Sequence, residues 1–195
     1  MKIGLIGLGK MGANMSKRLL QGGHKVVGFD RDQQAVKGIV KDGNEGASSI
    51  DELISKLPAP KVVWIMVPAG KPVDDTIDLL IPKMKNGEIL IDGGNSYYKD
   101  SMRRAKKLAE HGISMIDAGV SGGIWGLKEG YSMMVGGDKK AVDQVRPIFG
   151  RVSGEKTKWT PMNLEQTNRR LECQLFLRSI IFLTMSASSN AVNGF

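Results

Sequence analysis

Apolar and polar positions over the first 150 residues follow a strand-then-helix rhythm. Short apolar runs, of the length of strands, lie at residues 3–6, 26–29, 62–67, 89–91, 113–116 and 132–135. Segments with helical spacing lie between them, at about residues 11–21, 33–41, 72–85, 97–111 and 139–149. Pro82 should end or bend the third of these helices early. The rhythm predicts an α/β domain with a doubly wound, mostly parallel sheet that helices cover on both faces.

The character of the chain changes after Gly150. Only Gly154 and Gly194 of the 25 glycines lie beyond that point, and a polar stretch leads into an apolar, helix-like run at about 164–185. We therefore expect a domain of residues 1–150 followed by an atypical, partly helical tail, residues 151–195. The longest apolar tract, 171–185, contains two charges and is shorter than the roughly 20 residues of a membrane span.

The first apolar run leads directly into Gly7-Leu8-Gly9-Lys10-Met11-Gly12, and a helical pattern follows. This is G-x-G-x-x-G in a strand-turn-helix context, which is typical of dinucleotide binding in a Rossmann-like fold. Gly7 permits the tight turn, Gly9 lets the backbone approach a pyrophosphate, and Gly12 lets helix and strand pack closely. The phosphates would lie at the helix N-terminus.

The second apolar run ends at Asp30, where an acidic residue binds the ribose 2′-hydroxyl of NAD. Arg31 complicates the assignment, because a guanidinium can stack on adenine or pair with the 2′-phosphate of NADP. Asp32 adds a negative charge that would repel that phosphate. The residues favour NAD slightly over NADP.

Three further turns follow strands of the predicted sheet: residues 67–70, residues 92–96 and residues 117–123. The first is either a backbone contact to the dinucleotide or an ordinary strand-to-helix turn. The other two carry amide and hydroxyl groups among glycines, which suits a site that binds carboxylate, hydroxyl and nicotinamide groups, although such turns are also common as plain structure. Trp125 lies just beyond them, either over the pocket or packed against the core.

Composition narrows the choice of partners. The chain has 28 Lys and Arg against 20 Asp and Glu, a formal charge of +8, yet no nucleic-acid-binding motif accompanies the scattered basic residues. We interpret them as solvated helix faces with attraction for phosphorylated small molecules. The single cysteine, Cys173, excludes an internal disulfide, and we expect no metal site. With no secretion signal recognised, the predicted location is cytoplasmic.

Three runs resemble a known family: GLIGLGKMGANM, IDGGNSYYKDSMRR and GVSGGIWGLKEGYSMMVGG. Together they are similar to decarboxylating 6-phosphogluconate dehydrogenase, most closely to its shorter bacterial type. The family belongs to gluconate metabolism and the pentose phosphate pathway. It oxidises 6-phosphogluconate with NAD or NADP and releases ribulose 5-phosphate and carbon dioxide.

The resemblance implies which residues bind the ligands. The residues expected to line the cofactor are Gly7, Leu8, Gly9, Lys10, Met11, Gly12, Asp30, Arg31, Asp32, Val67, Pro68, Ala69 and Asn95. The residues expected to hold the substrate, a small phosphorylated sugar acid, are Asn95, Ser121, Gly122 and Gly123. Pro68 departs from the lysine of the longer members. The family is homodimeric, largely through an all-helical domain; here a short helical tail stands in its place, and neither nucleic acid nor membrane is an expected partner.

The family's catalytic lysine and glutamate lie in a run of the type G-A-G-H-x-x-K-M-x-H-N-G-I-E, which this sequence does not contain. The catalytic residues therefore stay unassigned. The tail is either a divergent extension or the product of a truncated or frame-shifted coding sequence. Its abrupt change in composition favours the second origin. Two alternative functions remain: a noncatalytic NAD(P)-binding module, and a 3-hydroxyacid dehydrogenase acting on a small unphosphorylated acid.

Overall fold

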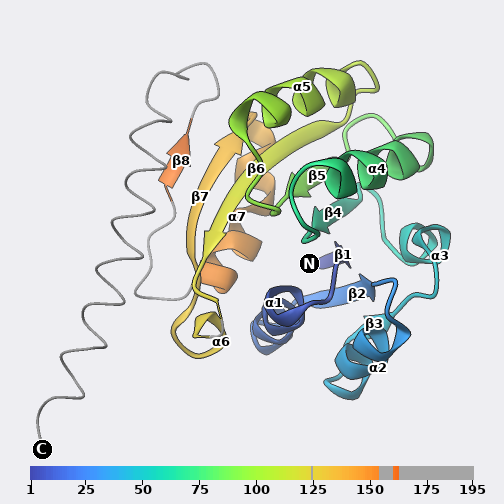
Figure 1. Ribbon diagram of the computed structural model, residues 1–195, viewed down its shortest axis with the longest axis vertical. Coiled ribbons are helices and arrows are strands. Elements are labelled where there is room, and N and C mark those ends of the chain that lie inside the picture. The colour runs from blue at the N-terminus through green and yellow to red at the C-terminus, as the bar shows by residue number, and fades with distance from the viewer. Residues whose placement is uncertain (124, 154–159, 163–195) are drawn as a thin grey trace, which may run out of the picture. The chain divides into compact units, whose positions relative to one another are not determined.

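The computed structural model describes residues 1–123, 125–153 and 160–162 (Figure 1). Its strands are β1 Lys2–Ile6, β2 Lys25–Phe29, β3 Glu45–Gly46, β4 Val62–Ile65, β5 Ile89–Asp92, β6 Ser114–Ser121, β7 Ser132–Gly137 and β8 Thr160–Met162. Its helices are α1 Lys10–Gln21, α2 Gln33–Lys41, α3 Ile50–Ser55, α4 Lys71–Leu80, α5 Tyr98–Ala109, α6 Gly126–Glu129 and α7 Lys139–Ser153, with a 3₁₀ turn η1 at Ile81–Lys83.

The described strands form one sheet in the order β3-β2-β1-β4-β5-β6-β7-β8. Every neighbouring pair is parallel except β6 and β7, which are antiparallel. The chain thus builds outward from β1 in one direction as far as β3, and then returns to place β4, β5 and β6 on the other side of β1. The expected Rossmann-like, mostly parallel and doubly wound sheet is confirmed.

Alternation along the strands produces two cores, one on each face of the sheet. Ile3, Val62 and Ile89 belong to the core under α1, α2 and α7, whereas Val63 and Leu90 belong to the core under α3, α4 and α5. Successive side chains of a strand point to opposite faces, and a sheet covered on both faces needs apolar residues on both. This explains why these strands are continuous apolar runs.

Two expectations about element ends have different outcomes. The prediction that Pro82 ends its helix early is confirmed, because α4 stops at Leu80 and η1 follows. The prediction that a strand stops at residue 116 is wrong, since β6 continues to Ser121. Its extension pairs antiparallel with β7, from Ile116 with Gly137 to Ser121 with Ser132, which supplies partners for its backbone groups.

The predicted domain boundary near residue 150 stays a prediction. Helix α7 continues to Ser153, and β8 then pairs with β7. The helical tail proposed for residues 164–185 lies outside the described residues. Within the described part, no helix has the length and apolar character needed to cross a membrane, and no group of three or more His, Cys, Asp or Glu side chains is arranged to hold a metal ion.

Candidate functional site

The turns singled out from the sequence meet at one edge of the sheet. Strands β1, β2, β4, β5 and β6 run parallel, so the turns that follow them lie along the same carboxyl edge. The strand order reverses between β1 and β4, because β2 and β3 lie on one side of β1 and the later strands on the other. In open α/β sheets such a switch point is where ligands bind.

The glycine turn after β1 has the geometry that its sequence predicts. Gly7 has φ 97°, a left-handed conformation that favours glycine, and its N–H donates to the Phe29 carbonyl at 2.9 Å. A Cβ on Gly12 would lie 2.0 Å from the Gly7 carbonyl oxygen, so helix α1 approaches the turn as closely as it does only because Gly12 has no side chain.

Gly9, in contrast, borders open space. A Cβ there would meet no atom within 4 Å, and its φ of −59° is open to any residue. Gly9 is the N-cap of α1, where no side chain caps the first turn and no acidic residue lies in it. The first-turn N–H groups, which have no partner inside the helix, are therefore available to an anion, and these residues fit a dinucleotide diphosphate.

Asp30 joins the glycine turn to the end of β2. Its Oδ2 accepts a hydrogen bond from the Leu8 N–H at 2.6 Å, and its Oδ1 accepts one from the Asp32 N–H at 2.9 Å. Asp32 in turn caps α2, accepting from the Gln34 N–H at 2.8 Å. Arg31 is exposed between the two aspartates. The carboxylate expected to bind ribose thus also fixes the turn expected to bind phosphate.

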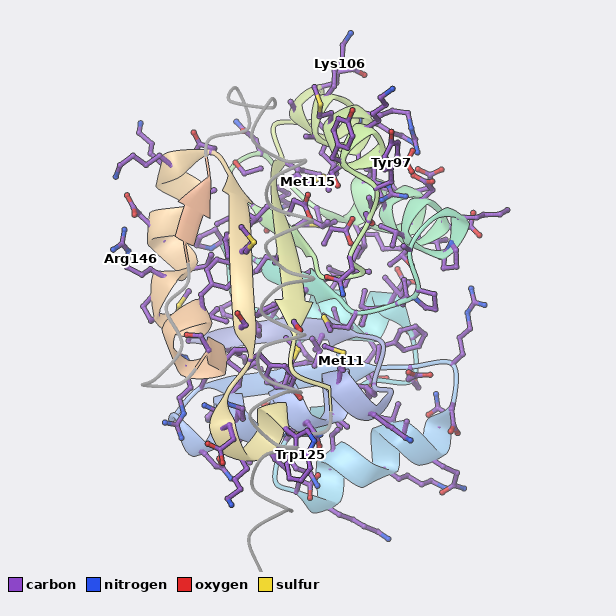
Figure 2. The ribbon with its side chains drawn as sticks, turned by 60° about the vertical axis from the view of Figure 1, so that its left-hand side comes forward. Met11, Tyr97, Lys106, Met115, Trp125 and Arg146 are labelled. Atoms are coloured by element: carbon purple, nitrogen blue, oxygen red, sulfur yellow. The ribbon has the colours of Figure 1, made fainter. Side chains whose placement is uncertain are left out.

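The remaining residues expected to line a cofactor lie along the same edge. Lys10 is exposed at the first position of α1, and Met11 is half-buried against the core beneath that helix. Figure 2 labels Met11 at the start of α1. After β4, Val67 packs against the opposite core, while Pro68 and Ala69 are exposed ahead of α4.

Asn95 connects the turn after β5 to strand β6. Its Nδ2 donates to the Val120 carbonyl at 3.1 Å, and its Oδ1 accepts from the Val120 N–H at 2.9 Å. Among the described residues it is the one non-glycine with positive φ, at 56°. Asparagine tolerates this left-handed conformation better than most residues. The side chain is therefore held in place while one N–H and one oxygen lone pair remain for a ligand.

A buried arginine lies directly behind this turn. The Arg104 guanidinium on α5 is fully buried and donates to the Asp92 Oδ2 at 3.2 Å and to the Ser96 hydroxyl at 2.7 Å. It also donates to both oxygens of Asp74, at 2.8 and 3.2 Å, and to the Gly70 carbonyl at 3.0 Å. One side chain thus holds the turn after β4 and the turn after β5.

The charges around Arg104 stabilise one another. Burial alone would lower the pKa of the Arg104 guanidinium, but the hydrogen bonds and charge of Asp74, together with the charge of Asp92, outweigh burial and raise that pKa. Hydrogen bonding from Arg104 holds the pKa of the Asp74 carboxyl below its ordinary value, against the effect of burial, and Arg103 assists from the surface. Arg104 and Asp74 therefore each favour the charged form of the other.

The expected substrate residues lie at the end of β6 and just beyond it. Ser121 is the last residue of the strand, and Gly122 and Gly123 follow with φ of 143° and 48°. A Cβ on Gly123 would meet no atom within 4 Å. Trp125, labelled beside α6 in Figure 2, is 70% exposed, so the interpretation that it packs into the core is wrong.

A second buried arginine anchors the helix that carries the glycine turn. Arg18 on α1 is only 7% exposed and donates to the carbonyls of Leu127 at 2.9 Å, Val152 at 3.1 Å and Arg151 at 3.2 Å. Burial lowers the pKa of this guanidinium, and the nearby Arg151 lowers it further. Arg18 thus ties α1 to α6 and to the last turn of α7.

The two buried arginines correct the expectation that the basic residues occupy solvated helix faces. Arg18 and Arg104 are buried and join separate elements instead, whereas Arg103, beside Arg104, is exposed as expected. No local spacing could have marked Arg104, because its partners lie 8, 12, 30 and 34 positions away in the sequence and meet only when the sheet has formed.

Comparison with known proteins places the chain among dehydrogenases. The family model described as the NAD binding domain of 6-phosphogluconate dehydrogenase matches residues 2–161. The Bacillus subtilis protein YqeC, whose name marks it as a candidate 6-phosphogluconate dehydrogenase, is 46% identical over 149 residues, which are 76% of this chain and 50% of that protein. The NAD(+)-dependent, decarboxylating 6-phosphogluconate dehydrogenase of Haloferax volcanii is 41% identical over 153 residues, 78% of this chain and 50% of that protein.

A solved structure supports the same placement. Plasmodium falciparum 6-phosphogluconate dehydrogenase, determined as the apo form and in complexes with NADP+ and with 6-phosphogluconate, superposes with a TM-score of 0.75 at 34% identity. The match covers 80% of this chain and 35% of that one. The chain spans about half the length of the two curated relatives described above.

Proposed function

Because the chain belongs to the family of the NAD-binding domain of 6-phosphogluconate dehydrogenase, we propose that it is the cofactor-binding half of an oxidoreductase of that type. Its substrate is 6-phosphogluconate, and the products are ribulose 5-phosphate, carbon dioxide and the reduced nucleotide. The bound nicotinamide supplies the hydride acceptor. The residues of this chain bind and orient both molecules.

The observation that carries this proposal is the uncapped N-terminus of α1. Its first-turn N–H groups have neither an acidic residue nor a capping side chain, and Gly9 beside them borders open space. A diphosphate at this point accepts from those N–H groups and gains from the helix dipole. Asp30 and Arg31 then flank the adenosine ribose, and Val67, Pro68 and Ala69 lie on the side of the nicotinamide.

NAD is the preferred cofactor in this proposal. Two carboxylates, Asp30 and Asp32, flank the position of the adenosine ribose, so a 2′-phosphate would bring a third negatively charged group to this end of the site. Asp30 retains lone pairs for the ribose hydroxyls beside its two backbone hydrogen bonds. Relatives are named for either nucleotide, so this preference rests on the two carboxylates alone.

The substrate lies against Asn95, Ser121, Gly122 and Gly123. The amide of Asn95 is fixed by Val120 and retains one donor and one acceptor, and the two glycines let a polyhydroxy acid approach the backbone. The reaction also needs a base for the substrate hydroxyl and an acid for the product. We expect neither from this chain alone, so it binds the nucleotide without turnover unless another polypeptide supplies them.

The binding test uses the 195-residue chain, NAD titrated by calorimetry, and the variant Gly9→Val. The space beside Gly9 accepts a valine in the free protein but not together with a diphosphate, so we expect an unchanged melting temperature and a loss of NAD affinity of at least about tenfold. Gly38→Ala is the matched control. Gly38 lies in α2 with equally open space, and its variant should bind NAD as the parent does.

Two outcomes would overturn the proposal. One is a chain that is folded by circular dichroism yet shows no saturable binding of NAD or NADP. The other is NAD binding that Gly9→Val leaves intact. Turnover is measured in parallel, as reduced nucleotide formed from 6-phosphogluconate; a finite rate would show that the acid and base are present after all.

A further inference from the structure

We propose that Arg104 is a positioning residue for the nicotinamide half of the site. It holds the turn after β4 and the turn that carries Asn95 in one fixed relation, and it does so without touching the ligand. The inference rests on the proposed function, since it concerns the same dinucleotide.

The topology divides the site into two halves. A dinucleotide lies across the switch point of the sheet, with its adenosine over the half that begins with β1 and β2 and its nicotinamide over the half that begins with β4. Asp30 and the glycine turn belong to the first half. Every polar contact described for Arg104 lies in the second half: Gly70 and Asp74 follow β4, in its turn and in α4, and Asp92 and Ser96 lie at the end of β5 and in its turn.

The guanidinium fork connects those two turns. Its Nη2 donates to the Gly70 carbonyl at 3.0 Å, next to the exposed Pro68–Ala69 segment. Its Nη1 donates to the Ser96 hydroxyl at 2.7 Å, one residue from Asn95. The planar fork fixes the angle between these bonds, so the two turns cannot shift independently.

Ser96 transmits this placement to Asn95. The serine hydroxyl donates to the Asp92 Oδ2 at 2.8 Å while it accepts from Arg104, and the Asp92 Oδ1 accepts from the Gly94 N–H at 2.9 Å. The turn of residues 92–96 is therefore held from inside at both of its ends. Asn95, with its left-handed backbone, projects from the outer side of a turn that Arg104 keeps in register.

This arrangement predicts a selective effect on binding. Loss of the fork should loosen the nicotinamide half and leave the adenosine half, which Arg104 does not contact, unchanged. A purely structural arginine would instead weaken both halves, because global loosening does not distinguish them. ADP-ribose, which lacks the nicotinamide, reports on the adenosine half by itself.

The test compares NAD with ADP-ribose by calorimetry in the full chain and in three variants. Arg104→Lys keeps the charge but loses the fork, and Ser96→Ala removes the hydroxyl that accepts from Arg104 and donates to Asp92. In both of these variants we expect the NAD affinity to fall by about threefold to tenfold, as for the loss of one or two hydrogen bonds. The ADP-ribose affinity should stay within about twofold of the parent value. Arg103→Gln removes the exposed neighbour that binds the same Asp74 carboxylate, and it should change neither affinity.

Equal losses for the two ligands, or no loss for NAD in Ser96→Ala, would overturn the inference. Ser96→Ala keeps the test decisive if Arg104→Lys does not fold, because Ser96 is only half-buried. A parent chain that binds neither ligand would refute the proposed function itself, and that result differs from an equal loss in the variants.

Discussion

The side chain of Asn95 forms two hydrogen bonds with the backbone of a single residue, Val120. The donor and the acceptor of its amide reach the Val120 carbonyl and N–H at 3.1 and 2.9 Å, in the manner of one strand pairing with another. These bonds join the turn after β5 to the penultimate residue of β6. They place an amide group beside the exposed end of β6, where the substrate residues begin.

Two replacements of Asn95 show how much its left-handed backbone conformation contributes to the free energy of unfolding, apart from these hydrogen bonds. Asn95→Gly loses both bonds but adopts φ 56° freely, whereas Asn95→Ala loses both and must also hold the left-handed conformation. We expect Asn95→Ala to be less stable than Asn95→Gly by about 1 kcal/mol in urea unfolding. A glycine variant less stable than the alanine variant would contradict this account of the turn.

Gly12 should tolerate no side chain. The Cβ of Gly12→Ala would lie 2.0 Å from the Gly7 carbonyl oxygen, so α1 must move away from the turn. We expect a loss of about 2–3 kcal/mol in unfolding free energy, together with weaker NAD binding because the first-turn N–H groups move with the helix. Gly150→Ala, in α7 with open space around it, is the control and should be neutral or stabilising. An unperturbed Gly12→Ala protein would show that the close approach is unnecessary.

Cofactor preference should respond to Asp32. Asp32→Ser removes a negative charge beside the expected adenosine ribose yet keeps a good N-cap for α2, since serine caps a helix nearly as well as aspartate. Without that charge, the attraction of Arg31 for a 2′-phosphate is less offset by repulsion. The ratio of NADP to NAD affinity should therefore rise by about threefold to tenfold at low salt and by less at high salt. Parallel titrations with both nucleotides measure the ratio. An unchanged ratio would place the 2′-position elsewhere.

The Asp74 carboxylate should make stability depend on pH below its ordinary pKa of 3.8. Because Arg104 and Arg103 lower that pKa in the folded state, the contribution of Asp74 is fully present above pH 3.8 and is lost as the pH falls through the lower, folded value. Asp74→Asn should therefore be about 1–2 kcal/mol less stable than the parent at pH 7, with the gap narrowing toward pH 2.5.

Asp75→Asn is the control for this pH dependence. Asp75 pairs only with the exposed Lys71 among the described contacts, so its variant should stay within about 0.5 kcal/mol of the parent. Denaturant unfolding across the pH series measures both variants. A gap for Asp74→Asn that widens as the pH falls would contradict the ion-pair account.

The elements that the sequence predicted are those encoded locally. The strands β1, β2, β4 and β5 were recognisable as short, continuous apolar runs, and the glycine motif specified its turn through Gly7 and Gly12. Short elements such as β3 and α3 gave too brief a pattern to be recognised. The extension of β6 through Ser121 depends on its pairing with β7, and no local sequence pattern predicts that pairing.

The site was predictable as a set of turns but not as a connected structure. Polar residues on glycine-rich turns indicate where a ligand lies, since parallel strands bring their ends together. The bonds between the turns join residues far apart in sequence, such as Arg104 to Gly70, Asn95 to Val120 and Asp30 to Leu8. These contacts exist only once the sheet order is set, so residue type and spacing could not indicate them.

The most direct test of the central claim, that a dinucleotide binds along the carboxyl edge of the sheet, is a nuclear magnetic resonance titration of the isotope-labelled chain with NAD. The account predicts saturable shifts of the backbone amides at residues 8–12, 30–32, 67, 69–70 and 94–96, with little change in α7. ADP-ribose should reproduce the first two groups of shifts and largely omit the last two. Shifts confined to other surfaces, or none at millimolar NAD, would contradict it.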